Sequence, residues 1–140
     1  MKDQYKHLVE KACEARSNSH SPYSNFKVGA ALLATDGRVF VGTNVENASF
    51  GLSNCAERTA VFTAVTAGAK EFEAIAVCAD GTEPTAPCGA CRQVLVEFGL
   101  DMVVLIAGQD GSGGAVRQTT VRQLVPDAFV TFVDHTREGS

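Results

Sequence analysis

The amino-acid sequence predicts an α/β protein of three layers, α/β/α, in which helices cover both faces of a mixed central sheet. Three observations predict this class. Apolar residues recur at helical spacing near the start of the chain, an Asp-Gly turn joins two short apolar runs, and helix and strand patterns then alternate. The chain has 140 residues, which suits a single domain spanning residues 1–140.

The first part of the chain predicts a helix followed by a hairpin. Residues 2–17 carry apolar side chains at helical spacing with charged residues between them, which indicates an amphipathic helix. Two short apolar runs, 27–33 and 38–44, flank Thr35-Asp36-Gly37. Because Asp-Gly between such runs is typical of a tight turn, we expect an antiparallel pair of strands here.

The rest of the chain alternates between helical and extended patterns, which are separated by glycine or proline. The apolar run at 102–107 has no polar face, as expected for a strand covered by helices on both sides. The predicted elements are a helix over 55–67 that ends at Gly68, a strand over 74–79, a helix over 88–98 that ends at Gly99, a strand over 102–107, a glycine-rich loop over 109–115, and a short helix over 119–125 before Pro126.

Composition and charge exclude several classes of partner. Lys and Arg number 12 against 16 Asp and Glu, which gives a net charge of −4. A nucleic acid polymer is therefore not an expected partner. Residues 1–7 are polar, unlike a signal peptide, and no window is as apolar as a membrane span, so we expect a cytoplasmic protein without a membrane partner.

Five cysteines are unusual in such a chain. A reducing compartment disfavours a disulfide framework, and an odd count argues in the same direction. We expect Cys13, on the apolar face of the first helix, and Cys78, inside an apolar strand, to be buried thiols. Metal binding or catalysis better explains the other three, Cys55, Cys88 and Cys91.

Two helix starts carry the chemistry. Cys88-Gly89-Ala90-Cys91 follows Pro87, and Cys55-Ala56-Glu57 begins the earlier helix. If the two starts meet at one end of the sheet, three thiolates can bind zinc and leave its fourth position open to water, as in a catalytic site. Glu57 could then move a proton, and Arg58 could offset the thiolate charge through a hydrogen bond.

Each of these motifs is ambiguous when it stands alone. A single Cys-x-x-Cys could be a redox pair, half of a zinc knuckle, or two buried thiols. Cys-x-Glu by itself is nearly uninformative. Their combination is far more specific, because Cys-x-Glu followed by Pro-Cys-x-x-Cys is the signature of zinc deaminases.

The chain resembles the small, homotetrameric cytidine deaminases. Phe50 departs from this family, which usually has Tyr there, so any hydrogen bond from that hydroxyl is lost. The tail at 131–140 shares no motif with the family. The resemblance is carried by PYSNFKVGAAL at 22–32, NVENASFG at 44–51, CAERTA at 55–60, PCGACRQVL at 87–95 and, more weakly, LVPDAF at 124–129.

The resemblance implies a cytidine deaminase-like fold and a zinc-dependent reaction. Cytidine and 2′-deoxycytidine would be hydrolysed to uridine and 2′-deoxyuridine with release of ammonia, a step of pyrimidine salvage. Cys55, Cys88 and Cys91 would hold Zn²⁺, and Glu57 would pass a proton from the zinc-bound water to N3 and then to the leaving amine. The backbone N–H of Ala56 would bind the pyrimidine carbonyl.

The same resemblance implies how a nucleoside is held. Asn44 and Glu46 would bind the ribose hydroxyls, mainly the 3′-OH, and their spacing of two places both side chains on one face of an extended segment. Phe26 would line the pocket, and Phe129 would reach in from a neighbouring subunit of a homotetramer with shared active sites. Without the resemblance, both phenylalanines would be interpreted as core residues and Glu46 as a solvated turn carboxylate.

Two other functions stay open at this stage. One is deamination of another aminated nucleoside, such as a nucleoside antibiotic. The other is a non-catalytic zinc-binding domain, which would explain three cysteines but not Glu57. The glycine-rich segment at 111–114 lacks the lysine of a P-loop, which favours a nucleoside over a nucleotide.

Overall fold

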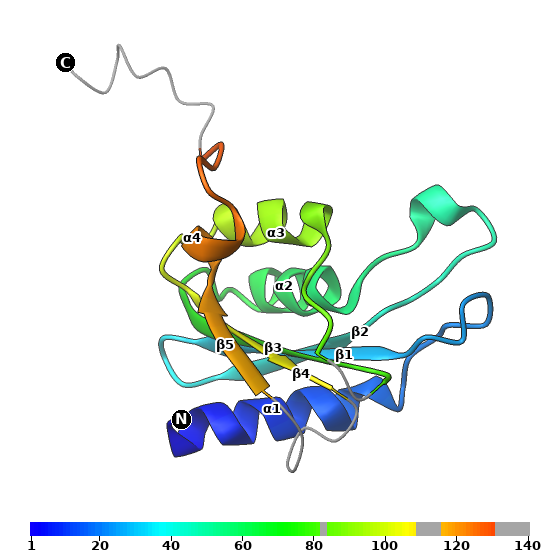
Figure 1. The fold of residues 1–140 in the computed structure, drawn as a ribbon, viewed down its shortest axis with the longest axis horizontal. Coiled ribbons are helices and arrows are strands. Elements are labelled where there is room, and N and C mark those ends of the chain that lie inside the picture. The colour runs from blue at the N-terminus through cyan, green and yellow to red at the C-terminus, as the bar shows by residue number, and fades with distance from the viewer. Residues whose placement is uncertain (82–83, 109–115, 131–140) are drawn as a thin grey trace.

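A computed structural model describes residues 1–81, 84–108 and 116–130. Five strands form one sheet in the order β2-β1-β3-β4-β5. Helix α1 covers one face, and α2 and α3 cover the other (Figure 1), which confirms the predicted three layers. The elements are α1 (Asp3–Arg16), β1 (Val28–Ala34), β2 (Val39–Thr43), the 3₁₀ helix η1 (Phe50–Leu52), α2 (Ala56–Thr66), β3 (Phe72–Ala79), α3 (Gly89–Val96), β4 (Val103–Ala107), β5 (Val116–Thr120) and α4 (Val121–Leu124).

The sheet is mixed, as predicted. β1 pairs antiparallel with β2 and β3, β3 pairs parallel with β4, and β5 runs antiparallel at the far edge. The predicted hairpin is confirmed, since Leu33 pairs with Val39 across the turn. Gly37 adopts a φ of 95° there, a conformation that L side chains rarely adopt.

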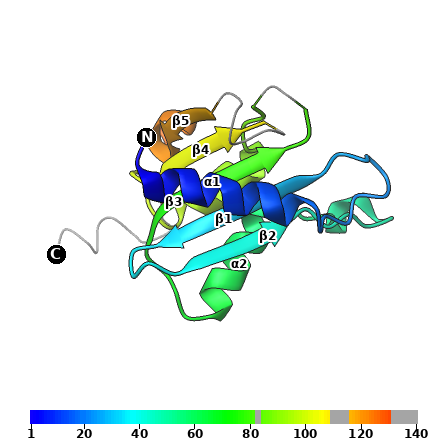
Figure 2. The same cartoon turned by 90° about the horizontal axis from the view of Figure 1, so that it is seen from below.

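The core has two parts, one on each face of the sheet. The backbone alternation of β1 sends Ala31 and Leu33 toward α1, whereas Leu32 packs with Val61 of α2 on the other face. Figure 2, in which the protein is seen from below, shows α1 lying across the strands of the sheet. Because both faces are covered, β1, β3 and β4 are almost continuously buried.

The end of the chain differs from the prediction. The helix expected over 119–125 begins only at Val121, and β5 occupies the residues before it. β5 is an edge strand whose Arg117 and Gln118 are exposed, so it has no apolar signal in the sequence. Thr120 caps α4 through a reciprocal bond pair with Gln123. The expected loop over 109–115 and the tail at 131–140 lie outside the described residues.

The expectation that Cys13 and Cys78 are separate thiols is wrong. The two form a disulfide with their Cα atoms 5.1 Å apart, although 65 positions separate them in the chain. Helix α1 packs on β3 and brings Cys13 over Cys78. Neither residue lies in a recognisable pairing motif, so only the docking of the helix makes the bond possible. None of the helices in the described ranges is long and apolar enough to cross a bilayer.

Candidate active site

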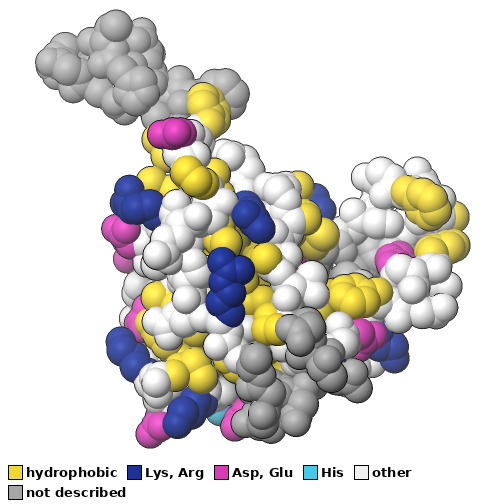
Figure 3. Space-filling view, viewed as in Figure 1, with side chains coloured by type: hydrophobic (Ala, Val, Ile, Leu, Met, Phe, Trp, Pro, Cys, Tyr) yellow, Lys and Arg dark blue, Asp and Glu magenta, His cyan; other side chains and the backbone are white. Residues whose placement is uncertain are grey.

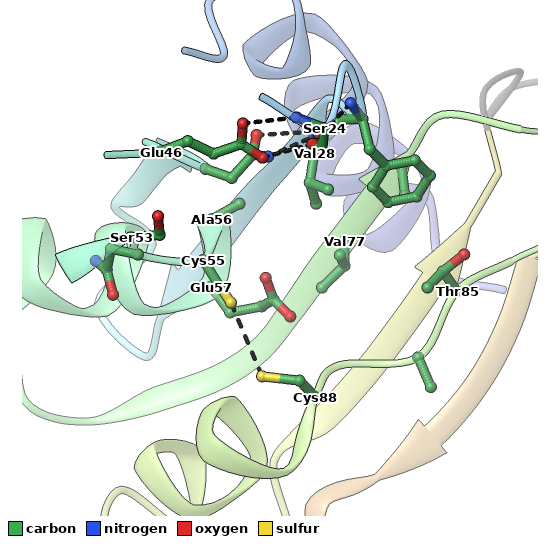
Figure 4. A pocket seen from close by; sticks show the side chains of 15 residues that line it. Ser24, Val28, Glu46, Ser53, Cys55, Ala56, Glu57, Val77, Thr85 and Cys88 are labelled. Carbon is green, nitrogen blue, oxygen red and sulfur yellow. Dashed lines mark hydrogen bonds between the residues drawn. The ribbon is translucent and has the colours of Figure 1, made fainter. Parts of the chain in front are cut away.

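Three cysteines from two helices meet at one end of the sheet. Cys55 is the N-cap of α2, Cys88 is the N-cap of α3, and Cys91 lies in the first turn of α3. Their Sγ atoms all lie within 4.8 Å of one another. The Sγ of Cys88 is 3.8 Å from that of Cys55 (Figure 4) and 3.5 Å from that of Cys91. The sequence-based expectation that the two helix starts converge is therefore confirmed.

The spacing of the three sulfurs fits zinc. Tetrahedral zinc binds thiolates at about 2.3 Å, which places neighbouring sulfurs about 3.8 Å apart. The separations from Cys88 are close to this value. In the described part of the chain, the metal-ligating group contains these three residues and no fourth. A tetrahedral ion held here would keep one coordination position for another molecule.

Arg58 supplies positive charge to the cluster. Its Nη2 donates to the Sγ of Cys55 at 3.4 Å, as expected from the sequence. Hydrogen bonding from the Cys91 thiol, together with this contact, lowers the pKa of Cys55 to about 5. The same pairing, together with burial, raises the pKa of Cys91. Cys55 is thus the first of the two to become a thiolate, and the helix N-terminus favours that charge.

Glu57 lies beside the sulfurs but does not belong to their cluster. Its side chain points into the adjoining cavity (Figure 4), and the residue is only 5% exposed. Burial raises the pKa of this carboxyl group to about 7. A group that gains and loses a proton near neutral pH is suited to general acid–base catalysis.

A glycine fixes the position of α2 against the sheet. A Cβ placed on Gly42 in β2 would lie 2.4 Å from the backbone nitrogen of Ala60 and 2.7 Å from the carbonyl oxygen of Ala56. Only a residue without a side chain permits this approach. Because Cys55 and Glu57 flank Ala56, the close contact also sets where these two residues lie.

The cavity beside the cluster has a volume of about 320 Å³. This volume lies within the range of about 300–1,000 Å³ that is common for small-molecule sites. It brings together most of the residues expected from the sequence: Phe26, Asn44, Glu46, Cys55, Ala56, Glu57 and Cys88. Arg58 and Cys91 do not line it. Phe129 does not line this cavity; it is 57% exposed, and its carbonyl accepts a hydrogen bond from Gln93.

The polar wall of the cavity is held by hydrogen bonds. Asn44 donates through Nδ2 to the carbonyl of Phe26 at 2.8 Å and accepts from the N–H of Val28 at 3.0 Å. Glu46 accepts from the backbone N–H groups of Tyr23 and Ser24. Both side chains lie just beyond β2, as expected.

Sequence reasoning assigned no role to Ser24 or Thr85, which also line the cavity. Ser24 lies inside the first matched motif, so the signal for it was present in the sequence. Thr85 lies outside every matched motif, and only the path of the chain before α3 brings it to the cavity.

A three-thiol cluster beside a buried carboxyl group, at the mouth of a cavity on an α/β sheet, defines a metal-dependent hydrolytic enzyme. The family model described as "Cytidine and deoxycytidylate deaminase zinc-binding region" matches residues 2–107. The chain belongs to this family, and its cofactor is zinc.

Relatives and solved structures agree with this assignment. A cytidine deaminase of Halalkalibacterium halodurans is 49% identical over 123 residues, which are 87% of this chain and 91% of that protein. The crystal structure of a cytidine deaminase from Burkholderia pseudomallei has a TM-score of 0.84 at 52% identity, and the match covers 92% of this chain and all of that one. A cytidine deaminase structure from Mycobacterium tuberculosis gives 0.77 at 39% identity and covers 92% and 98%.

Proposed function

We propose that this chain catalyses the hydrolytic deamination of cytidine and 2′-deoxycytidine to uridine and 2′-deoxyuridine, with release of ammonia. The observation that carries the proposal is the buried carboxyl group of Glu57 beside three clustered sulfurs, in a cavity of small-molecule size. Relatives named cytidine deaminase, at up to 49% identity over most of the chain, support the choice of substrate.

Zinc is held by Cys55, Cys88 and Cys91 in this proposal. When bound, the ion supplies a nucleophile at neutral pH because it lowers the pKa of a water molecule that it ligates. Glu57 would accept the first proton of that water and deliver it to N3 of the base, and would then carry the second proton, from the hydroxyl group added at C4, to the leaving amine. Its burial and its pKa near 7 support this role.

The remaining cavity residues hold the nucleoside. Ala56 is the first residue of α2, and N–H groups of a first helical turn have no partner within the helix, so its N–H can bind the pyrimidine carbonyl. Phe26 offers an aromatic face to the base. Asn44 and Glu46 bind the ribose hydroxyls, since an amide can donate to a hydroxyl group and a carboxylate can accept from it.

A nucleoside is favoured over a nucleotide by the charge of the cavity. Among the described residues that line it, there is neither Lys nor Arg, whereas Glu46 and Glu57 are both present. A phosphate group would meet carboxylates without a neutralising cation. We expect 2′-deoxycytidine 5′-phosphate to be a much poorer substrate than 2′-deoxycytidine.

We also propose a homotetramer with shared active sites, in which Phe129 of one subunit reaches the cavity of another. Large apolar side chains support an assembly: Phe50 is 76% exposed, Leu52 71% and Phe129 57%. Figure 3 shows hydrophobic side chains at the outer end of the connection between β2 and α2, which carries η1. Light scattering would give the mass of the assembly, and Phe129→Ala should raise KM if the ring completes the site.

Cytoplasmic location and a role in pyrimidine salvage follow from the resemblance and complete the proposal. Cell fractionation checks the location. The role is checked by asking whether the gene lets a cytidine deaminase-deficient pyrimidine auxotroph grow with cytidine as its pyrimidine source.

The deciding experiment follows the loss of cytidine absorbance on mixing with purified protein, with and without a chelator. Chelator-sensitive turnover of cytidine is the expected result. A panel of other aminated nucleosides, including a nucleoside antibiotic, separates this proposal from its nearest alternative. Bound zinc without turnover of any of them would favour a non-catalytic zinc domain, although the three-residue cluster argues against that function.

A further inference from the structure

The hydroxyl group of Ser24 contacts two residues that line the cavity, Glu46 and Phe26. The Oγ donates to Oε2 of Glu46 and accepts the backbone N–H of Phe26 at 3.0 Å. The backbone N–H of Ser24 also donates to Oε1 of Glu46 at 3.1 Å (Figure 4), and the N–H of Tyr23 donates to the same oxygen at 3.0 Å. One serine therefore contacts both carboxylate oxygens of Glu46 and the chain that carries the Phe26 ring.

These contacts favour the ionised form of Glu46. Hydrogen bonding from the Ser24 hydroxyl, together with the two backbone N–H groups, lowers the pKa of the carboxyl group. Each carboxylate oxygen has two acceptor sites, so Oε2 keeps one for a ligand after it accepts from Ser24. Glu46 is thus a fixed anion that lines the cavity and keeps acceptor capacity on Oε2.

Asn44, the other polar residue of this wall, has its acceptor capacity filled. Its Oδ1 accepts from the N–H of Val28 and from the hydroxyl of Ser19, which uses both lone pairs. One hydrogen of its Nδ2 is bonded to the carbonyl of Phe26, which leaves one N–H to offer. A sugar hydroxyl bound here must therefore accept from Asn44 and donate to Glu46.

We propose that Ser24 is a positioning residue for sugar recognition, whose hydroxyl fixes the Glu46 carboxylate and the Phe26 backbone in one arrangement. The inference rests on the proposed function, in which Glu46 binds the sugar hydroxyls. Without the hydroxyl, Glu46 keeps its two backbone donors and can rotate about them, while the N–H of Phe26 loses its acceptor. The loss falls on ligands with a 3′-OH and leaves the reacting end of the cavity unchanged.

The test compares two inhibitors that differ only in the 3′-OH, 2′-deoxyuridine and 2′,3′-dideoxyuridine, and adds KM and kcat for 2′-deoxycytidine. For Ser24→Ala we expect 2′-deoxyuridine to bind about 3- to 10-fold more weakly, as for one lost hydrogen bond. KM should rise by a similar factor. Binding of the dideoxy compound and kcat should each change less than about twofold. Ser24→Thr, which keeps the hydroxyl, should restore the difference between the inhibitors.

Two controls separate the possible failures. Ser17→Ala removes another serine hydroxyl from an exposed site at the end of α1 and should change no constant. Glu46→Gln should abolish most of the difference between the two inhibitors; if it does not, the proposed sugar contact of Glu46 is wrong. If Glu46→Gln behaves as expected but Ser24→Ala weakens both inhibitors equally, or neither, only the role of Ser24 is overturned. Ser24→Gly serves as a second hydroxyl-free variant should Ser24→Ala be poorly folded.

Discussion

The guanidinium of Arg58 lies 3.4 Å from the sulfur of Cys55, close enough to share the charge of the metal-binding cluster. Three thiolates around a dication leave one net negative charge, which an adjacent cation offsets. The sequence places this cation one residue after Glu57 and three after Cys55, so a single helical turn carries a proposed zinc ligand, the proposed proton carrier and a counter-charge.

Removing that counter-charge should weaken the metal site. We expect Arg58→Gln to lower zinc affinity by about 10- to 100-fold, as is common when a group that supports metal ligands is lost. Competition with a chromogenic chelator measures the change. Arg122→Gln removes an exposed ion pair with Asp101 and is the matched control. Equal zinc retention in the two variants would show that Arg58 does not support the thiolates.

Replacing the buried carboxyl group should separate metal binding from turnover. Glu57→Gln keeps the size of the side chain but cannot carry a proton, so kcat should fall by about 10²- to 10⁴-fold. Zinc content should stay normal, because Glu57 is not part of the sulfur cluster. Metal analysis and steady-state kinetics on the same sample check both statements. Near-normal deamination by this variant would contradict the proposed mechanism.

Replacing one of the three cysteines should, unlike Glu57→Gln, reduce zinc binding. Cys88→Ser replaces a proposed ligand with a hydroxyl group that binds zinc poorly at neutral pH. We expect a lower zinc content after mild chelation, together with a less stable tetramer. Metal analysis and light scattering report the two effects. Full zinc occupancy in Cys88→Ser would count against the assignment of this residue as a ligand.

Filling the contact between β2 and α2 should destabilise the fold near the site. A Cβ on Gly42 meets backbone atoms of α2 that cannot move without the helix, so Gly42→Ala should cost about 1–3 kcal/mol of unfolding free energy. Urea unfolding measures it. Gly51→Ala is the control, because a Cβ there meets nothing within 4 Å. The same urea midpoint for both variants would disprove the packing argument.

Breaking the disulfide should lower stability without touching the site. The bond closes a separation of 65 residues, which corresponds to about 4 kcal/mol in a chain-entropy treatment. Cys13→Ala should therefore unfold at lower temperature than the wild type, and a reducing agent should remove most of that difference. If the unreduced, denatured wild type shows five titratable thiols, the bond does not form in solution.

Much of the fold could be predicted from local signals. The periodicity around Leu8 and Val9, the Asp36-Gly37 turn and the glycine that follows the C-cap of α2 are all properties of short segments. The sequence predicts that the next helix ends at Gly99, but α3 already ends at Val96. β5 could not be predicted in this way, since Arg117 and Gln118 give it a polar pattern and its stability comes from pairing with β4. Strand pairing depends on a neighbour that no local window contains.

The candidate site also has features that the sequence indicates and features that only the tertiary structure shows. The sequence alone determined the chemistry of the site: three cysteines, a glutamate and an arginine at two helix starts, with Asn44, Glu46 and Phe26 from matched motifs. Only the tertiary structure decided that the three sulfurs meet, that Ser24 holds Glu46, and that Cys13 bonds to Cys78. The reason is physical: residue types and spacing fix what a side chain can do, whereas distances across 33 or 65 positions depend on how helices pack on the sheet.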